Sequence, residues 1–199
     1  MKLYSEQDEQ THILRAVSHL PTPGHFLDIG AFDGESFSNT CALVELGWSG
    51  VMVEPALEAC AKLLKRHGNN PKVTIVHGVV TTHPGLVKFW NNQTTHSSTI
   101  QGHDYGRPLL PAYWTPGVLL VELLNLIGTN PVHVLSIDAE GESVNLLEAY
   151  PWGERALPLC VCVEHDQDPK RVAKIMHDAN HRYRLVNDNG TNAIYRLGG

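Results

Sequence analysis

The fold of this 199-residue chain is decided by the stretch Phe26-Leu27-Asp28-Ile29-Gly30-Ala31-Phe32-Asp33-Gly34. It reads as an apolar strand that enters a turn with the pattern Asp-x-Gly-x-x-x-Gly and continues into a helix. Twenty residues after Gly34, the apolar run Val51-Met52-Val53 ends in the carboxylate of Glu54. A strand, a glycine turn, a helix and a second strand ending in an acid form the first half of a nucleotide-type βαβ unit.

One position in this turn discriminates between ligands. A dinucleotide site has a glycine at the centre of the turn, so that the backbone can approach a pyrophosphate. Here that position is Phe32. S-adenosylmethionine contains ribose and adenine but no phosphate, so it tolerates the side chain. We therefore expect S-adenosylmethionine as the cofactor, with its ribose hydroxyls on Glu54 and its carboxylate near the backbone N–H groups of 31–36.

Composition limits the class of protein. With 42% hydrophobic and 18% charged residues, the chain is typical of one globular domain, 1–199. Its formal net charge of −6 argues against a nucleic-acid partner, which attracts a positive protein surface. The most apolar segment, 117–128, is interrupted by Glu122 and Asn125, so no membrane span is expected. The acidic N-terminus does not resemble a signal peptide, and we expect a cytoplasmic protein.

Strand and helix signals alternate along the chain after an N-terminal helix expected over 5–20, within the segment 1–23. Further helices are expected over 35–46 and 117–127, and a closing hairpin over 183–195. Such alternation predicts an α/β fold with three α/β/α layers, a Rossmann-like and mostly parallel sheet, and a C-terminal antiparallel hairpin. The four cysteines lack metal-ligand spacing and are expected to be buried thiols.

The stretch 91–116 breaks the alternation. It carries three prolines and the aromatic residues Tyr105, Tyr113 and Trp114. A connection of this length in a compact domain is typical of a functional lid, and we expect a substrate lid here. The alternative is a surface loop that pins its aromatic residues onto the core.

A second cluster of acids follows the strand that ends at Ile137. Asp138 and Glu140 come directly after this strand, and Glu164 ends the next one. The carboxyl ends of parallel strands meet at one edge of the sheet, so these acids should share the crevice with Gly30 and Glu54. We expect Asp138 to act as the general base, with Glu140 or Glu164 as its neighbour.

At this point the chain resembles the FkbM-type branch of class I S-adenosylmethionine-dependent methyltransferases. The resemblance rests on four segments in the family's order. They are Phe26–Ala31, Val53-Glu54-Pro55, Leu135-Ser136-Ile137-Asp138-Ala139-Glu140-Gly141-Glu142 and Val163-Glu164-His165. The resemblance implies the seven-strand methyltransferase sheet and, usually, O-methylation of a sugar, a polyketide or a similar small molecule. One departure is Ser136, where family members tend to carry a lysine.

Together these arguments give a set of expected site residues. Cofactor binding is expected from Asp28, Gly30, Ala31, Phe32, Gly34, Ser36, Glu54, Pro55, Gly78 and Val79. Catalysis is expected from Asp138, Glu140 and Glu164, and contact with the small-molecule acceptor from His165, Tyr105, Tyr113 and Trp114.

Two alternatives stay open at this point. The acids near Asp138, together with His165, offer ligands for a divalent metal that would orient a diol, although a metal is not favoured. The chain could instead be a binding module that retains the cofactor pocket without catalysis. The oligomeric state is open.

Overall fold

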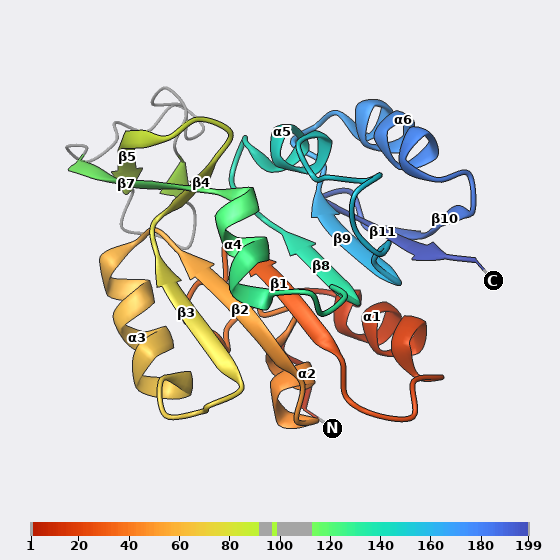
Figure 1. Cartoon of the computed structure of the whole chain (residues 1–199), viewed down its shortest axis with the longest axis horizontal. Coiled ribbons are helices and arrows are strands. Elements are labelled where there is room, and N and C mark those ends of the chain that lie inside the picture. Colours follow the sequence, from red (N-terminus) through yellow and green to blue (C-terminus); the bar gives the residue numbers. More distant parts are fainter. Residues whose placement is uncertain (1, 92–96, 99–112, 199) are drawn as a thin grey trace.

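The computed structural model describes residues 2–91, 97–98 and 113–198. Its main sheet contains β1 (His25–Ile29), β2 (Ser49–Glu54), β3 (Val73–His77), β8 (Val134–Ile137), β9 (Cys160–Glu164), β10 (Tyr183–Asp188) and β11 (Asn192–Leu197). These seven strands lie in the order β10-β11-β9-β8-β1-β2-β3 (Figure 1). The strand β11 pairs antiparallel with β9 and β10, and the other pairs in this sheet are parallel, which confirms the predicted mostly parallel sheet and C-terminal hairpin.

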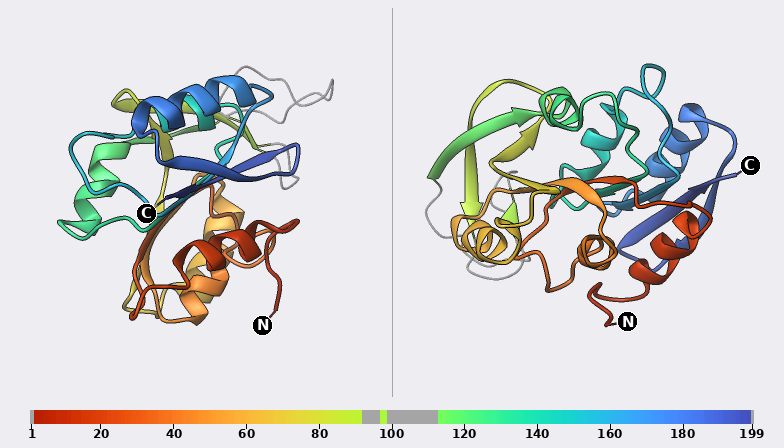
Figure 2. Two further views of the ribbon diagram at one scale, coloured as in Figure 1. Left: turned by 90° about the vertical axis from the view of Figure 1, so that its right-hand side faces the viewer. Right: turned by 60° about the horizontal axis from the view of Figure 1, so that its bottom comes forward.

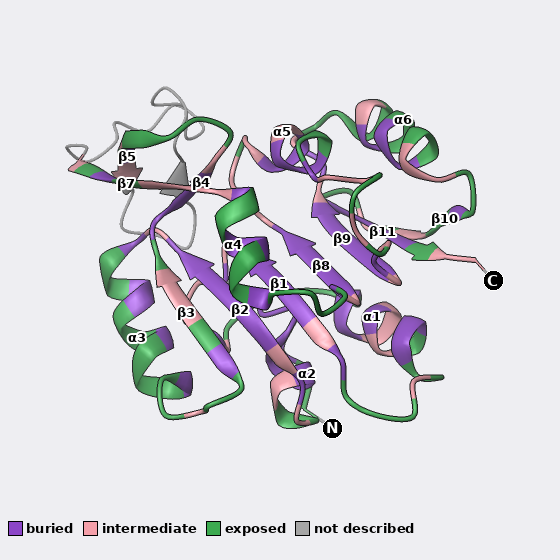
Figure 3. Cartoon of the chain, viewed as in Figure 1, coloured by how far each residue is buried: buried purple, intermediate pink, exposed green. Residues whose placement is uncertain are grey.

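Helices cover both faces of this sheet (Figure 2). One face carries α1 (Glu9–Val17), α2 (Cys41–Glu45) and α3 (Leu57–His67), and the other carries α4 (Leu120–Ile127), α5 (Ser143–Glu148) and α6 (Pro169–Ala179). Because both faces are covered, the central strands are buried along almost their whole length, as Figure 3 shows. The four cysteines are buried and free, as expected. No helix in the described residues is long and apolar enough to cross a membrane.

A smaller sheet lies beside the carboxyl ends of β2 and β3 (Figure 1). It contains β4 (Val79–Thr81), β5 (Gly85–Asn91), β6 (Ser97–Ser98) and β7 (Tyr113–Leu119), in the order β4-β7-β5-β6. The strand β7 corrects two expectations. The last part of the expected lid is a sheet strand, and the helix expected from Gly117 begins only at Leu120. The backbone of Gly117 instead pairs with β4 and β5, and Glu122 accepts the Leu119 N–H at 2.8 Å to start the helix.

The helix expected over 35–46 is wrong in its first half, because α2 begins only at Cys41. The carboxylate of Asp33 accepts the N–H groups of Glu35 and Ser36 at 2.9 and 2.7 Å, as the N-cap of a helix would. Phe37 then has a φ of 58°, which no α-helix accommodates. The Ser38 hydroxyl accepts the Cys41 N–H at 2.9 Å and sets the later start. The left-handed conformation of Phe37 therefore interrupts the helix, and Ser38 caps its later start.

The chain reverses its direction of travel across the sheet between β1 and β8, so the crevice for a ligand lies at their carboxyl ends. The turn at Gly30 passes very close to Asp138. A Cβ atom at Gly30 would lie 1.8 Å from the Asp138 carbonyl oxygen, and the φ of Gly30 is +86°. The protein's own backbone therefore requires this glycine, whereas the sequence had suggested that the ligand does.

We expect Gly30→Ala to destabilise the fold by about 3 kcal/mol or more, because two backbone segments must separate to admit a methyl group. Urea unfolding measures the change. Gly153→Ala is the matched control, since no atom lies within 4 Å of its Cβ position, and it should leave the midpoint nearly unchanged. Wild-type stability in Gly30→Ala would contradict this account of the turn.

Candidate functional site

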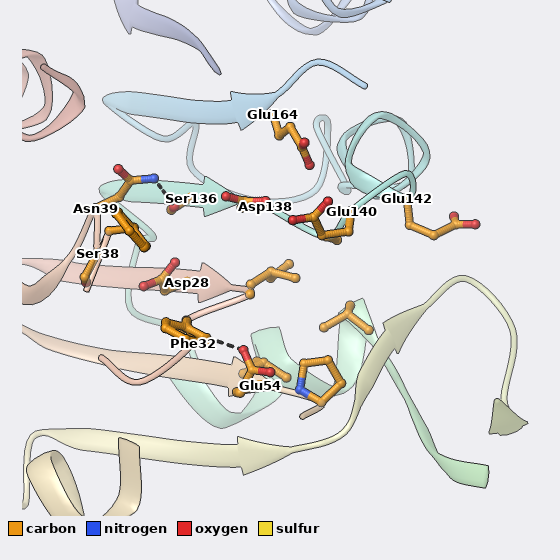
Figure 4. Close-up of a pocket in the computed structure, with 18 of the residues that line it drawn as sticks. Asp28, Phe32, Ser38, Asn39, Glu54, Ser136, Asp138, Glu140, Glu142 and Glu164 are labelled. Carbon is orange, nitrogen blue, oxygen red and sulfur yellow. Dashed lines mark hydrogen bonds between the residues drawn. The ribbon is translucent and has the colours of Figure 1, made fainter. Parts of the chain in front are cut away.

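A pocket opens at the carboxyl ends of β1, β2, β8 and β9 (Figure 4). Twelve of the expected residues line it: Asp28, Gly30, Ala31, Phe32, Ser36, Glu54, Pro55, Gly78, Val79, Asp138, Glu140 and Glu164. The structure thus brings together two acid-containing segments that lie more than eighty residues apart in the sequence.

Glu54 is held firmly at one side of the pocket. Its two carboxylate oxygens accept the N–H groups of Phe32 and Ala56, at 2.8 and 2.7 Å (Figure 4). Removal from water raises the pKa of Glu54 to about 7, and the two backbone donors oppose this rise. Each oxygen retains a lone pair for another donor. The side chain is therefore a fixed acceptor, 5% exposed, beside the pocket.

Most N–H groups of the turn between Gly30 and Ser36 already donate to protein acceptors. Gly30 and Ala31 donate to the Val53 carbonyl at 3.0 and 2.9 Å, and Phe32 donates to Glu54. The N–H groups of 34–36 are taken by the Ala31 carbonyl and the Asp33 carboxylate. These bonds leave few N–H groups of 31–36 for the carboxylate of a cofactor, so that contact stays a prediction, and the same arrangement disfavours a phosphate.

Asp28 lies beneath the pocket in a polar chain that the sequence did not predict. The Thr40 hydroxyl donates to its Oδ2 at 2.5 Å, and Asn39 donates through Nδ2 to the Ser136 hydroxyl at 3.3 Å (Figure 4). Removal from water raises the pKa of Asp28 to about 6, although hydrogen bonds with Thr40 and Ser136 lower it. Ser136, which stands where members of the FkbM-type family tend to carry a lysine, is thus a hydrogen-bond partner of Asp28.

Asp138, Glu140 and Glu164 converge on the opposite side of the pocket (Figure 4). Removal from water raises the pKa of both Asp138 and Glu164, and a negative neighbour raises each pKa further. For Asp138 this neighbour is Glu140, and for Glu164 it is Asp138. A hydrogen bond between the two carboxyl groups favours ionised Asp138 with protonated Glu164. The pair therefore shares a proton and titrates closer to neutrality than ordinary acids.

The loop that carries Glu140 is held in an unusual conformation. Glu140 has a φ of 44°, which is uncommon for a residue other than glycine. The Ser143 hydroxyl accepts the Ala139 N–H at 2.8 Å, and Asp166 accepts the Gly141 N–H at 2.8 Å. These two bonds fix the backbone on either side of Glu140 and keep its side chain at the pocket.

Four other expected residues do not line the pocket. Gly34 faces α3, where a Cβ atom would lie 2.6 Å from Leu63. Tyr113 supports the pocket wall from behind through a hydrogen bond of 3.0 Å to the Pro55 carbonyl, whereas Trp114 is 65% exposed. His165 is buried, with Nε2 3.8 Å from Asp188. A fifth, Tyr105, lies outside the described residues.

Several residues that line the pocket were not predicted from the sequence. They are Glu6, Ile29, Phe37, Ser38, Asn39, Val53, Val80, Phe89, Ser136, Ala139, Glu142, Thr191 and Asn192. Asn192 is 6% exposed, and its Oδ1 atom has no hydrogen-bond partner in the structure. It starts β11 and pairs in register with Glu164, so the last strand of the chain also contributes to the site.

The metal alternative gains no support from this geometry. In the described part of the chain, no group of three or more histidine, cysteine, aspartate or glutamate residues is placed to hold a metal ion. His165, one of the expected ligands, is turned toward Asp188.

Comparisons with known proteins identify the fold. No family model and no curated protein matches the chain. Among solved structures, it is similar to methyltransferase FkbM from Methylobacillus flagellatus KT, with a TM-score of 0.58 and 11% identity over 97% of this chain and 56% of that one. It is also similar to an rRNA methylase from Streptococcus thermophilus (TM-score 0.52, 10% identity, 100% and 99% covered). A third is precorrin-6y C5,15-methyltransferase from Geobacter metallireducens GS-15 (TM-score 0.52, 10% identity, 98% and 92% covered).

These likenesses show a Rossmann-like α/β fold that the chain shares with these methyltransferases. At such low identities they do not place the chain in the FkbM-type family. The chain also spans only 56% of the length of the first of these structures.

The crowded acids predict a pH dependence of stability. The pKa of Glu164 is raised in the folded state, so folding loses stability as the pH rises through that raised value. Glu164→Gln removes the charge and should raise the free energy of unfolding by about 1–2 kcal/mol at pH 9, with little change at pH 4.

Urea unfolding at both pH values measures this difference. Glu154→Gln, at an exposed position, is the control and should show no such dependence. A Glu164→Gln protein that is less stable than wild type at pH 9 would argue against the shared-proton pair.

Proposed function

We propose that the protein is an enzyme that transfers a methyl group from S-adenosylmethionine to a hydroxyl oxygen of a small molecule. The observation that carries the proposal is the shared pocket: a fixed acceptor, Glu54, on one side and a proton-sharing pair, Asp138 and Glu164, on the other. Glu54 can accept hydrogen bonds from the ribose hydroxyls of a nucleoside. The Asp138–Glu164 pair can remove a proton from the hydroxyl of an acceptor.

The pocket fits the adenosine part of this cofactor. Glu54 would accept hydrogen bonds from the ribose hydroxyls, since each of its oxygens retains a lone pair. Pro55, Val79 and Phe89 provide an apolar wall for the adenine ring. The N–H groups at the Gly30 turn are already committed to protein acceptors, which favours a nucleoside ligand without phosphate at this turn.

When bound, S-adenosylmethionine supplies a methyl group on a positively charged sulfur, which keeps the electrons of the broken carbon–sulfur bond as a neutral thioether. The protein must then align an acceptor oxygen with the methyl carbon and take up the hydroxyl proton. Asp138 is the ionised member of the pair and would accept this proton as the oxygen forms its new bond to carbon. Its raised pKa makes it a stronger base than an ordinary carboxylate.

A small-molecule acceptor fits the charge of the site better than RNA does. None of the described residues that line the pocket is a lysine or an arginine. The chain as a whole has a formal net charge of −6. Both the acidic lining of the pocket and the net negative charge of the chain would repel the phosphate backbone of RNA.

The cofactor assignment predicts a binding result. S-adenosylhomocysteine, the demethylated product, should bind in isothermal titration, and NAD should not. Glu54→Ala should weaken the binding by ~1.5–3 kcal/mol, because it removes a charged hydrogen-bond acceptor.

Glu58→Ala is the control, since Glu58 is exposed at the start of α3 and should leave the affinity unchanged. If wild type and Glu54→Ala bind S-adenosylhomocysteine equally tightly, Glu54 does not contact the ribose.

The role of Asp138 predicts a separation of binding from turnover. Asp138→Asn keeps the shape of the side chain and removes its basicity, so turnover should fall by ~10²–10⁴ while affinity for S-adenosylhomocysteine changes little. The assay is methyl incorporation into an acceptor found by screening hydroxylated metabolites.

Asp178→Asn, on the exposed surface of α6, should retain full turnover. Full activity of Asp138→Asn would show that Asp138 is not the base. Cofactor binding without turnover on any acceptor would favour a binding module instead.

A further inference from the structure

Two loops meet beside the proton-sharing pair: the loop from β8 to α5, residues 138–142, and the loop from β9 to α6, residues 165–168. Both contain left-handed conformations that residues other than glycine seldom adopt. Glu140 has a φ of 44°, and Asp166 and Gln167 have φ values of 47° and 62°. Such conformations cost free energy and persist only where the surrounding contacts hold them, often beside a functional site.

The carboxylate of Asp166 joins the two loops. Its Oδ1 atom accepts the Gly141 N–H at 2.8 Å, and its Oδ2 atom accepts the Val144 N–H at 3.2 Å. Helix α5 has no cap from its own N-cap residue, because the Glu142 side chain accepts no backbone N–H there. Asp166 therefore supplies, from 22 residues away, an acceptor for the opening turn of α5.

Asp168, in the same loop, acts as an ordinary helix cap. It is the N-cap of α6 and accepts the Arg171 N–H at 3.1 Å, so it caps the helix that directly follows it. One oxygen is enough for that bond, whereas Asp166 uses both of its oxygens. An asparagine amide offers only one acceptor oxygen, so the two contacts of Asp166 require a carboxylate.

The opening turn of α5 places Ser143, which is fully buried. Its hydroxyl accepts the Ala139 N–H at 2.8 Å and donates to Glu164 Oε2 at 3.3 Å. Because Asp166 holds N–H groups on both sides of Ser143, a shift of this turn would move the hydroxyl away from Glu164. Asp166 itself does not line the pocket. A carboxylate outside the pocket thus controls the contacts of one that lines it.

We propose that Asp166 is a positioning residue of the site, which holds Glu164 beside Asp138 through the opening turn of α5 and the Ser143 hydroxyl. This inference rests on the proposed function, in which the Asp138–Glu164 pair takes up the proton of the acceptor. In addition to the removal from water, which has the largest effect, the negative charge of Asp166 raises the pKa of both members of the pair. Asp166 therefore acts on the pair in two ways, by geometry and by charge.

The test follows the pH titration of the Glu164 carboxyl carbon by nuclear magnetic resonance. The protein is labelled with carbon-13 at the side-chain carboxyl of glutamate, and Glu164→Gln assigns the signal. Two variants separate geometry from charge. Asp166→Asn removes the charge and one acceptor oxygen. Asp166→Glu keeps the charge, but its carboxylate lies one methylene too far out to accept both N–H groups.

We expect the midpoint of the Glu164 titration to fall by about one pH unit in both variants, because Glu164 no longer lies against Asp138. The loss of the Ser143 bond acts in the opposite direction, but Asp138 raises the pKa of Glu164 more than this hydroxyl lowers it. In the acceptor assay, both variants should lower turnover about tenfold or more while the affinity for S-adenosylhomocysteine stays unchanged.

Asp168→Ala is the matched control. It removes the cap of α6, so it should lower the urea midpoint of unfolding, but it should leave turnover and the Glu164 titration at their wild-type values.

A wild-type Glu164 titration in Asp166→Glu would overturn the positioning role, whatever Asp166→Asn does, because the charge alone would then account for any effect. An equal shift in Asp168→Ala would also overturn it, since loosening of the whole loop would be the cause. Failure of S-adenosylhomocysteine to bind would overturn the proposed function, whereas the titration decides the positioning of Glu164 without any cofactor.

Discussion

The site depends on one close approach between two backbone segments. The turn at Gly30 passes the carbonyl of Asp138 so closely that no Cβ atom fits between them, and the Asp138 N–H donates to the Ile29 carbonyl at 2.9 Å. This contact joins the ends of β1 and β8, the two strands between which the chain changes direction across the sheet. Because these ends are joined, acids from distant parts of the sequence face a single pocket.

The cost of this arrangement is electrostatic. Burial and mutual repulsion raise the pKa values of Asp138 and Glu164, so the folded protein holds groups that would ionise more easily in water. Backbone N–H groups offset part of the same cost at Glu54, and a threonine hydroxyl does so at Asp28. At the ends of β8 and β9, the hydrogen bond between Asp138 and Glu164 and the Ser143 hydroxyl offset part of it. The groups that cost the fold stability are thus the groups that suit a proton transfer.

Much of this arrangement could be predicted from the sequence. The apolar runs before Gly30 and before Asp138 identify buried parallel strands, and acids at the ends of such strands are placed by topology alone. The turn after Gly30 could not be predicted. Its pattern is typical of a helix start, but Phe37 takes a left-handed conformation that delays α2 to a new cap at Ser38.

Long-range pairing explains the other differences. The residues of β7 form a strand because β4 and β5 lie on either side of them, which no local pattern records. Asn192 reaches the site because β11 is inserted beside β9, so its role depends on sheet order. His165 follows Glu164 directly, but its side chain lies near Asp188 instead of in the pocket.

The measurement that tests the central claim most directly is a crystal structure of the protein with S-adenosylhomocysteine. The account predicts that the ribose hydroxyls lie about 3 Å from the Glu54 carboxylate, with the sulfur on the side of Asp138 and Glu164. A ligand bound elsewhere, or bound in this pocket with its ribose away from Glu54, would contradict the account.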